Sequence, residues 1–192
     1  MLKESFGLIT QSASLESLYL VETDVTDDLV DVSFLKREAS GLENLRDIDL
    51  SHNCISSSYL TVMKRLQQKC HLINNISIAS CKFFQAQNQP IDALVKTYID
   101  PSFPSTPSFL YLRRLDLSSS IKGDEAPAKL ADSSAFKYLE FLKLKNCGIG
   151  NQGFADLVAS TNLRRLKVLI LSKNSISKLT FPFDDLKAAT VT

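Results

Sequence analysis

The chain of 192 residues has few of the residues from which catalytic and phosphate-binding motifs are built. It contains six glycines and only two histidines, His52 and His71. We find no glycine-rich phosphate loop, no HExxH helix and no nucleophile elbow. The spacings between its scattered cysteines and histidines match no zinc site. These gaps predict a protein that is not an enzyme and that takes no cofactor, no metal and no small-molecule substrate.

A strong charge of one sign is also missing. The net charge is +1, and the basic pairs Arg113-Arg114 and Arg164-Arg165 are balanced by acidic residues elsewhere. A nucleic-acid-binding protein usually presents a strongly basic face. We therefore interpret these pairs as solvated surface and expect no nucleic-acid partner.

Long apolar runs and paired cysteines are absent as well. No run approaches the roughly 20 apolar residues of a membrane helix, and the first residues make a poor signal peptide. Cys54, Cys70, Cys81 and Cys147 contain no CxxC pair, a pattern typical of reducing compartments. We therefore expect no membrane interaction and a cytoplasmic (intracellular) location.

The chain does contain a repeat. In "ENLRDIDLSHNCI" and "NLRRLKVLILSKNSI", a strand-like apolar run stops at an asparagine, Asn53 or Asn174. The frame LxxLxLxxNxI recurs in six copies, which start near Leu15, Leu45, Ile73, Leu112, Leu139 and Leu166. The ninth position is Asn, Cys, Thr or Ser, and we expect its side chain to bond to backbone groups where the chain leaves the strand.

The spacing between copies predicts a short strand followed by a helix on the return path. Each LxL is expected to be a parallel strand with its leucines pointing inward. Apolar residues from Tyr59 to Leu66 recur on one helical face. A second helix is predicted in "NQGFADLVAS", with Asn151 as its cap and with Phe154, Leu157 and Val158 on one face.

The repeat resembles the leucine-rich repeat family from about Leu15 to Ile176, and "CGIGNQGFADL" is similar to the ribonuclease-inhibitor-like class. The resemblance implies an α/β solenoid, with a curved parallel sheet of about six strands on the concave face and helices on the convex face. It implies a single domain over residues 1–192 and agrees with the expected intracellular location.

Two regions depart from the repeat. Residues 84–110 form a predicted loop insertion. A short helix is expected in "PIDALVKTYI", and Pro101, Pro104 and Pro107 exclude a regular helix in the "DPSFPSTPSF" that follows. This insertion is either loop drift or an added contact element for a partner. Residues 177–192 are predicted to be a C-terminal tail or cap. Because both terminal caps are weak, the chain is either a free-standing repeat protein or a segment of a longer one.

The concave face is the predicted site of partner binding. Positions three, five, seven and eight of each copy, Ser51 and Ser118 included, are expected to face outward there. Phe141, Val168 and Ile170 would form an apolar patch, which is either a contact site or an edge covered by a tail with Phe181 and Phe183 or by a following repeat. The predicted partner-binding residues are Tyr19, Asp47, Asp49, His52, Arg114, Asp116, Phe141, Lys143, Lys145, Val168 and Ile170.

Together these observations predict a non-enzymatic protein–protein interaction module whose protein partner is unidentified. One alternative is a regulator of a partner enzyme such as a GTPase activator, for which Arg114 or Asn146 would act on the bound GTPase. Another is a structural segment of a larger repeat protein.

Overall fold

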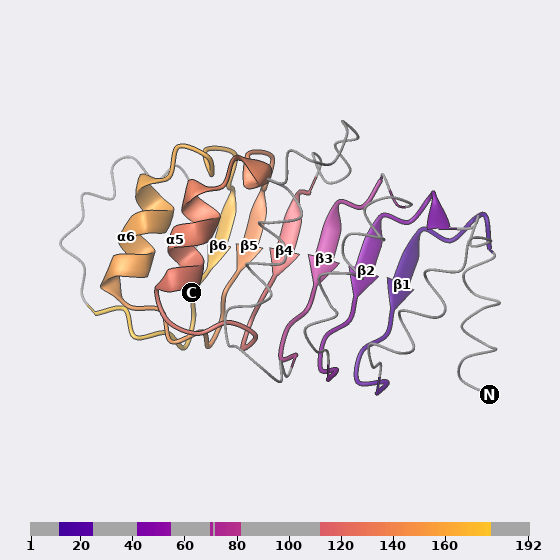
Figure 1. The fold of residues 1–192 in the computed structure, drawn as a ribbon, viewed down its shortest axis with the longest axis horizontal. Helices are drawn as coiled ribbons and strands as arrows, with labels where there is room; N and C mark the ends of the chain where they lie inside the picture. Colours follow the sequence, from indigo (N-terminus) through magenta and orange to yellow (C-terminus); the bar gives the residue numbers. More distant parts are fainter. Residues whose placement is uncertain (1–11, 25–41, 55–69, 71, 82–111, 178–192) are drawn as a thin grey trace, which may run out of the picture.

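The computed structural model describes residues 12–24, 42–54, 70, 72–81 and 112–177. Within these residues, six short strands form one parallel sheet in the order of the sequence (Figure 1). Each strand occupies the third to fifth positions of its repeat copy. The strands are β1 (Ser17–Tyr19), β2 (Asp47–Asp49), β3 (Asn75–Ser77), β4 (Arg114–Asp116), β5 (Phe141–Lys143) and β6 (Val168–Ile170). The α/β solenoid predicted from the repeat is confirmed.

Neighbouring strands pair without a shift in register, so equivalent positions of all copies stand in rows across the sheet. Because side chains alternate along a strand, the middle residue of each points to one face and its two neighbours to the other. The middle residues are buried in one continuous apolar core: Leu18, Ile48, Ile76, Leu115, Leu142 and Leu169. The opposite face is therefore left to the residues that differ between copies.

The chain leaves each strand through a left-handed turn. The eighth residue of every copy has φ between 53° and 63°, and none of the six is a glycine: Glu22, His52, Ser80, Ser119, Asn146 and Lys173. This conformation costs an ordinary residue roughly 1–2 kcal/mol. The backbone N–H of the eighth residue donates to the next copy, as from His52 to the Ala79 oxygen (2.8 Å). The turn thus extends the bonding between copies beyond the strand.

Two helices cover the core behind the C-terminal strands. They are α5 (Glu125–Asp132) and α6 (Asn151–Ala159), and η2 (Ser134–Phe136) is a 3₁₀ turn between them in sequence. Helix α6 was predicted, and Phe154 and Leu157 are buried as expected. The predicted cap was wrong, because the N-cap residue is Gly150. The Asn151 side chain instead bonds to the Ser177 hydroxyl (2.8 Å) and to its N–H (3.0 Å).

Helix α5 was not predicted, and Pro127 lies inside it. Its place in the first turn is compatible with a helix, since the first four N–H groups have no partner within the helix. Ala126, Leu130 and Ala131 face the core. Helices α5 and α6 lie side by side (Figure 1). A helix is about 10 Å wide and strands lie about 4.8 Å apart, so the helix side is longer and the strand side is concave.

Asp124, which precedes α5, connects the copy that contains α5 to the copy that contains α6. Its Oδ1 accepts a hydrogen bond from the Gly150 N–H (2.6 Å) at the start of α6. A Cβ atom at Gly153 would lie 2.6 Å from the same oxygen. Gly153 therefore leaves room for the carboxylate between the two copies.

Three predictions lie outside the described residues. These are the helix from Tyr59 to Leu66, the insertion at 84–110, and the tail or cap at 177–192 apart from Ser177. The extent of the domain, 1–192, stays a prediction. Across the described ranges, no helix has the length and apolar character to span a bilayer.

Candidate functional site

The ninth position of each copy forms an internal ladder, made of Thr23, Asn53, Cys81, Ser120, Cys147 and Asn174. The Asn53 amide donates to the carbonyls of Leu20 (2.5 Å) and Leu50 (2.9 Å), and its Oδ1 accepts from the Thr23 N–H (3.1 Å). Asn174 repeats this pattern, with bonds to the Leu144 and Leu171 carbonyls and from the Cys147 and Ile149 N–H groups. The predicted bonding of this position to backbone groups is confirmed.

The middle rungs use thiols and a hydroxyl for the same task. The Cys81 thiol donates to the Leu50 carbonyl (3.2 Å) and the Cys147 thiol to the Leu117 carbonyl (3.5 Å). The Ser120 hydroxyl donates to the Ile78 carbonyl and accepts from the Cys81 N–H (2.9 Å). Burial raises the pKa of both Cys81 and Cys147 to about 11. These thiols are therefore neutral structural groups at physiological pH.

The concave face, defined here by the third and fifth residues of the six copies, carries most of the predicted binding residues. At its N-terminal end Tyr19 is 62% exposed, and Asp49 stands beside it in the register. Asp47 accepts a bond from the Ser17 hydroxyl (3.0 Å), and Asp49 accepts from the Ser51 N–H (2.9 Å). Neither carboxylate is paired with a lysine or arginine in the part of the chain that the structure describes.

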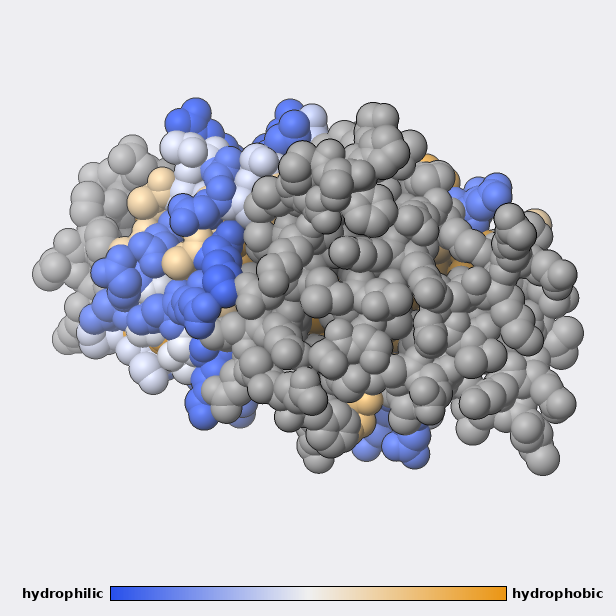
Figure 2. Space-filling view, in the orientation of Figure 1, coloured by the Kyte–Doolittle hydropathy of each residue, from blue (hydrophilic) through white to orange (hydrophobic). Residues whose placement is uncertain are grey.

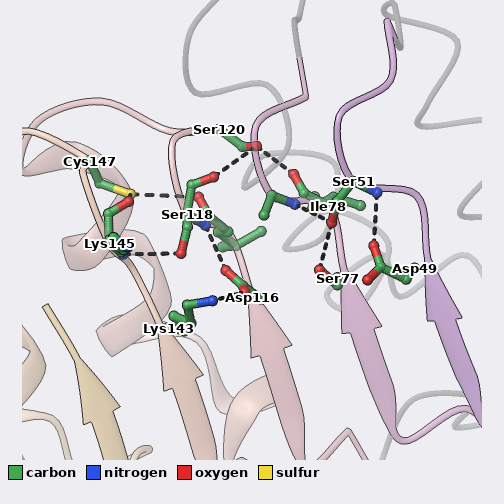
Figure 3. Close-up of polar contacts among 12 residues, drawn as sticks. Asp49, Ser51, Ser77, Ile78, Asp116, Ser118, Ser120, Lys143, Lys145 and Cys147 are labelled. Atoms are coloured by element: carbon green, nitrogen blue, oxygen red, sulfur yellow. Dashed lines mark hydrogen bonds and ion pairs between the residues drawn. The ribbon is translucent and has the colours of Figure 1, made fainter. Parts of the chain in front are cut away.

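At the C-terminal end, by contrast, charged groups have partners within the sheet. Lys143 Nζ lies 2.8 Å from Asp116 Oδ2, and Figure 3 shows this pair across strands β4 and β5. Asp116 Oδ1 also accepts from the Ser118 N–H (2.9 Å). The Arg114 guanidinium lies 4.6 Å from the centroid of the Phe141 ring, within cation–π range.

In copies 2 and 4 the seventh position differs from the prediction. Ser51 and Ser118 are buried, with 4% and 6% of their surfaces exposed. The Ser51 hydroxyl bonds to that of Ser77 (2.7 Å) and accepts from the Ala79 N–H (3.1 Å) (Figure 3). The Ser118 hydroxyl accepts from the Lys145 N–H (3.2 Å). Expecting both serines to face a partner was wrong, because they bond to the next copy.

The apolar residues of copies 5 and 6 are neighbours, as predicted, but they are only half-exposed. Phe141 pairs with Val168 in the register, and Ile170 pairs with Lys143. At the other end of the sheet, Tyr19 on this face and Val21 (41%), at the seventh position beside the face, are exposed. Val21 was not among the predicted binding residues. The predicted cover by Phe181 and Phe183 lies outside the described residues.

A second group of charges lies at the amino ends of the C-terminal strands. Glu140 bridges two cations, with Arg113 Nη1 at 2.5 Å and Lys167 Nζ at 2.7 Å. The hydrogen bond from Lys167, followed by the contacts of Arg113, lowers the pKa of the Glu140 carboxyl. Lys137 and Arg165 lie 5.0 Å and 4.9 Å from the centroid of the Tyr138 ring.

The histidine, cysteine and acidic side chains of the described residues are dispersed. These residues contain no group of three or more His, Cys, Asp or Glu side chains that could hold a metal ion. None of the four cysteines forms a disulfide, and His71 lies outside the described residues. His52 is exposed in its left-handed turn. Arg114 and Asn146, on which a GTPase activator would depend, contact Phe141 and the Ser119 hydroxyl (3.0 Å) respectively.

The side of the sheet that carries α5 and α6 is the surface opposite the concave face. The described atoms over α5 and α6 are mostly hydrophilic (Figure 2). A cleft of about 320 Å³ between the ends of the two helices is lined by small and polar residues, among them Ala131, Ser160 and Asn162. Both polar side chains already donate to the Ala131 carbonyl, at 2.6 Å and 3.0 Å. The cleft therefore supports a helix-end contact between copies.

Comparison with known proteins bears on the fold. No protein-family model and no curated protein matches the sequence. Among solved structures, the tropomodulin C-terminal domain of Caenorhabditis elegans superposes with a TM-score of 0.60 at 12% identity, over 85% of this chain and 92% of that one. The chain has the leucine-rich repeat fold.

A second leucine-rich repeat structure, an internalin from Listeria monocytogenes, matches with a TM-score of 0.42 at 16% identity. That match covers 80% of this chain and 49% of the internalin. At these identities the likeness extends to the fold alone. The shared fold therefore assigns no role to the sheet of this chain.

Proposed function

We propose that the chain is a non-enzymatic interaction module that binds a protein partner with its concave face. The observation that carries this proposal is that different positions of the repeat serve the fold and the exposed face. Leucine positions and the ninth-position ladder serve the core and the backbone, whereas the third and fifth positions vary from copy to copy. A row of varied side chains on a rigid sheet is a surface on which specificity can be built.

The chemistry of this surface supports a protein ligand. Tyr19, Val21, Phe141 and Ile170 supply apolar and aromatic area, and aromatic residues are enriched where proteins bind one another. Carboxylates and cations are interspersed with them, so both apolar burial and charge pairing are available to a partner.

The test is a binding comparison with two variants of the purified protein. Tyr19→Ala/Ile170→Ser changes the concave face at both ends, whereas Asp132→Lys/Asp156→Lys changes exposed or half-exposed carboxylates of α5 and α6. A partner is first isolated from a lysate of the source cells with the wild-type protein, and its affinity for the three proteins is then measured. Circular dichroism establishes that each variant is folded.

We expect the concave-face variant to bind at least about tenfold more weakly and the helix-side variant to bind like the wild type. Equal affinity of the concave-face variant, or a loss confined to the helix-side variant, would reject the concave face as the binding surface.

A further inference from the structure

Charge is divided between the two ends of the sheet. In copies 1 and 2, three carboxylates lie on or beside the concave face: Glu22 at the eighth position, Asp47 at the third and Asp49 at the fifth. No lysine or arginine occupies these positions in the two copies. In copies 4 to 6 the same positions, with the seventh, hold four cations and one carboxylate: Arg114, Lys143, Lys145, Lys173 and Asp116. Copy 3 between them has only Asn75, Ser77, Ala79 and Ser80, all uncharged.

Internal pairing removes part of the charge at one end only. Asp116 is paired with Lys143, so three cations remain at the C-terminal end, on Arg114, Lys145 and Lys173. We call these three residues the basic pole. Within the described ranges, none of the three forms an ion pair with a carboxylate.

The N-terminal end has the same geometry without the matching cation. Asp49 and Asp116 occupy the fifth position of their copies, and both accept the N–H of the residue two places on. The residue beside Asp116 in the register is Lys143, but the residue beside Asp49 is Ser77. We call Glu22, Asp47 and Asp49 the acidic pole. Because no cation of the described sheet pairs with these carboxylates, they are available to a cation from outside it.

The aromatic residues show the same contrast. Phe141 has the Arg114 guanidinium over its ring. Tyr19 is 62% exposed, and no described cation lies over it. An open aromatic ring beside carboxylates is a good environment for a lysine or arginine side chain, which gains both ion pairing and a cation–π contact.

We propose that the concave face binds a charge-polarised segment of a partner protein, with lysine or arginine side chains over β1 and β2 and carboxylates over β4 to β6. This inference rests on the proposed function and adds the partner's chemistry and direction. Five strand spacings of about 4.8 Å separate β1 from β6, or about 24 Å. An extended segment of about seven residues spans that distance. Opposite charges at its two ends would select one of its two directions across the sheet.

The experiment uses two fluorescent peptides of about ten residues and identical composition. In the block peptide the lysines and arginines occupy one half and the carboxylates the other, whereas in the alternating peptide the charges alternate. Affinities are measured at low and at high salt, because surface charge pairing is screened by salt. We expect the block peptide to bind at least about tenfold more tightly at low salt.

Three variants then test the direction. Glu22→Lys/Asp47→Lys reverses the acidic pole, Lys145→Glu/Lys173→Glu reverses the basic pole, and the third variant combines all four changes. Lysine is compatible with the left-handed turn at position 22, because Lys173 already adopts it at the equivalent position. Asp49 is left intact because it accepts the Ser51 N–H. Asp132→Lys/Asp156→Lys is the control for net charge.

Either single-pole variant should lose the preference for the block peptide, and the combined variant should regain it because the peptide then binds in the opposite direction. Equal binding of the two peptides by the wild type, or no recovery in the combined variant, would overturn the polarity and leave the proposed function standing. A partner that binds all concave-face variants with the affinity of the wild type would reject both proposals. Sedimentation of the protein alone tests whether a second copy of the chain occupies the concave face. A dimer that dissociates in either single-pole variant would overturn the partner segment in favour of a second copy.

Discussion

The ninth-position ladder and the concave face are built from the same six copies but tolerate variation differently. In the ladder, Asn, Ser, Cys and Thr all direct a donor at a backbone carbonyl, so the residue changes while the contact persists. On the concave face, a change of residue changes the contact itself: Asp116 pairs with Lys143, whereas Asp49 has Ser77 beside it. A constant interior thus allows the exposed rows to vary without disturbing the fold.

The largest effect is expected when the ladder loses an asparagine. Asn53→Ala removes donors to the Leu20 and Leu50 carbonyls and leaves the Thr23 N–H without its acceptor. Unpaired buried polar groups cost about 1–3 kcal/mol each, so we expect the free energy of unfolding to fall by about 3 kcal/mol in urea titrations. Asn75→Ala, which removes the same amide from the concave face, should change it by less than about 0.5 kcal/mol. Similar losses in both variants would contradict the contrast between ladder and face.

A smaller effect is expected at a cysteine rung. A thiol is a weak donor, so Cys147→Ala should lower the free energy of unfolding by about 1 kcal/mol. Cys147→Ser should be at least as stable as Cys147→Ala, because the Ser120 hydroxyl at the equivalent position donates to the Ile78 carbonyl and accepts from the Cys81 N–H. A serine variant that unfolds more easily than the alanine variant would show that the rung needs apolar volume rather than a donor.

The thiols also predict a dependence of stability on alkaline pH. The pKa of Cys81 and Cys147 rises from 9.0 to about 11 on folding, so both thiols stay protonated up to a higher pH in the folded state than in the unfolded state. Their contribution to stability is complete below pH 9 and is lost as pH rises from 9 through 11. The unfolding free energy of Cys81→Ser/Cys147→Ser should therefore fall less over this range than that of the wild type. Parallel curves for the two proteins would show that burial does not perturb these thiols.

How far the sequence predicted the molecule depends on the kind of contact. The repeat placed all six strands and the ladder, because apolar burial and backbone bonding impose a pattern on single residues. Helix α5 was not predicted; it contains Pro127, a residue type that is disfavoured in helix interiors. The left-handed eighth position was not predicted either, and no glycine marks it. The pairs Lys143–Asp116 and Arg114–Phe141 join neighbouring copies. They become visible in the sequence only when the register between copies is known.

The surface ion pair should contribute less than any rung. A double-mutant cycle with Lys143→Met and Asp116→Asn should give a coupling energy of about 0.5 kcal/mol, because Lys143 is about one-third exposed and water screens the pair. The coupling should weaken at high salt. A coupling as large as the loss in Asn53→Ala would place this pair among the structural contacts and contradict the assignment of Lys143 to a binding surface.

The smallest effect on stability is expected at the N-terminal end of the concave face. Tyr19→Ala/Asp47→Ser removes one exposed ring and one carboxylate whose bond is to the Ser17 hydroxyl. The free energy of unfolding should change by less than about 0.5 kcal/mol in thermal or urea unfolding. A loss above about 1 kcal/mol would assign these two residues to the structural part of the repeat.

The measurement that tests the central claim most directly is the affinity of an isolated partner for Tyr19→Ala/Ile170→Ser, determined beside the urea midpoint of the same variant. The concave-face account predicts a loss of at least about tenfold in affinity with an unchanged midpoint. Unchanged affinity in a folded variant would contradict it.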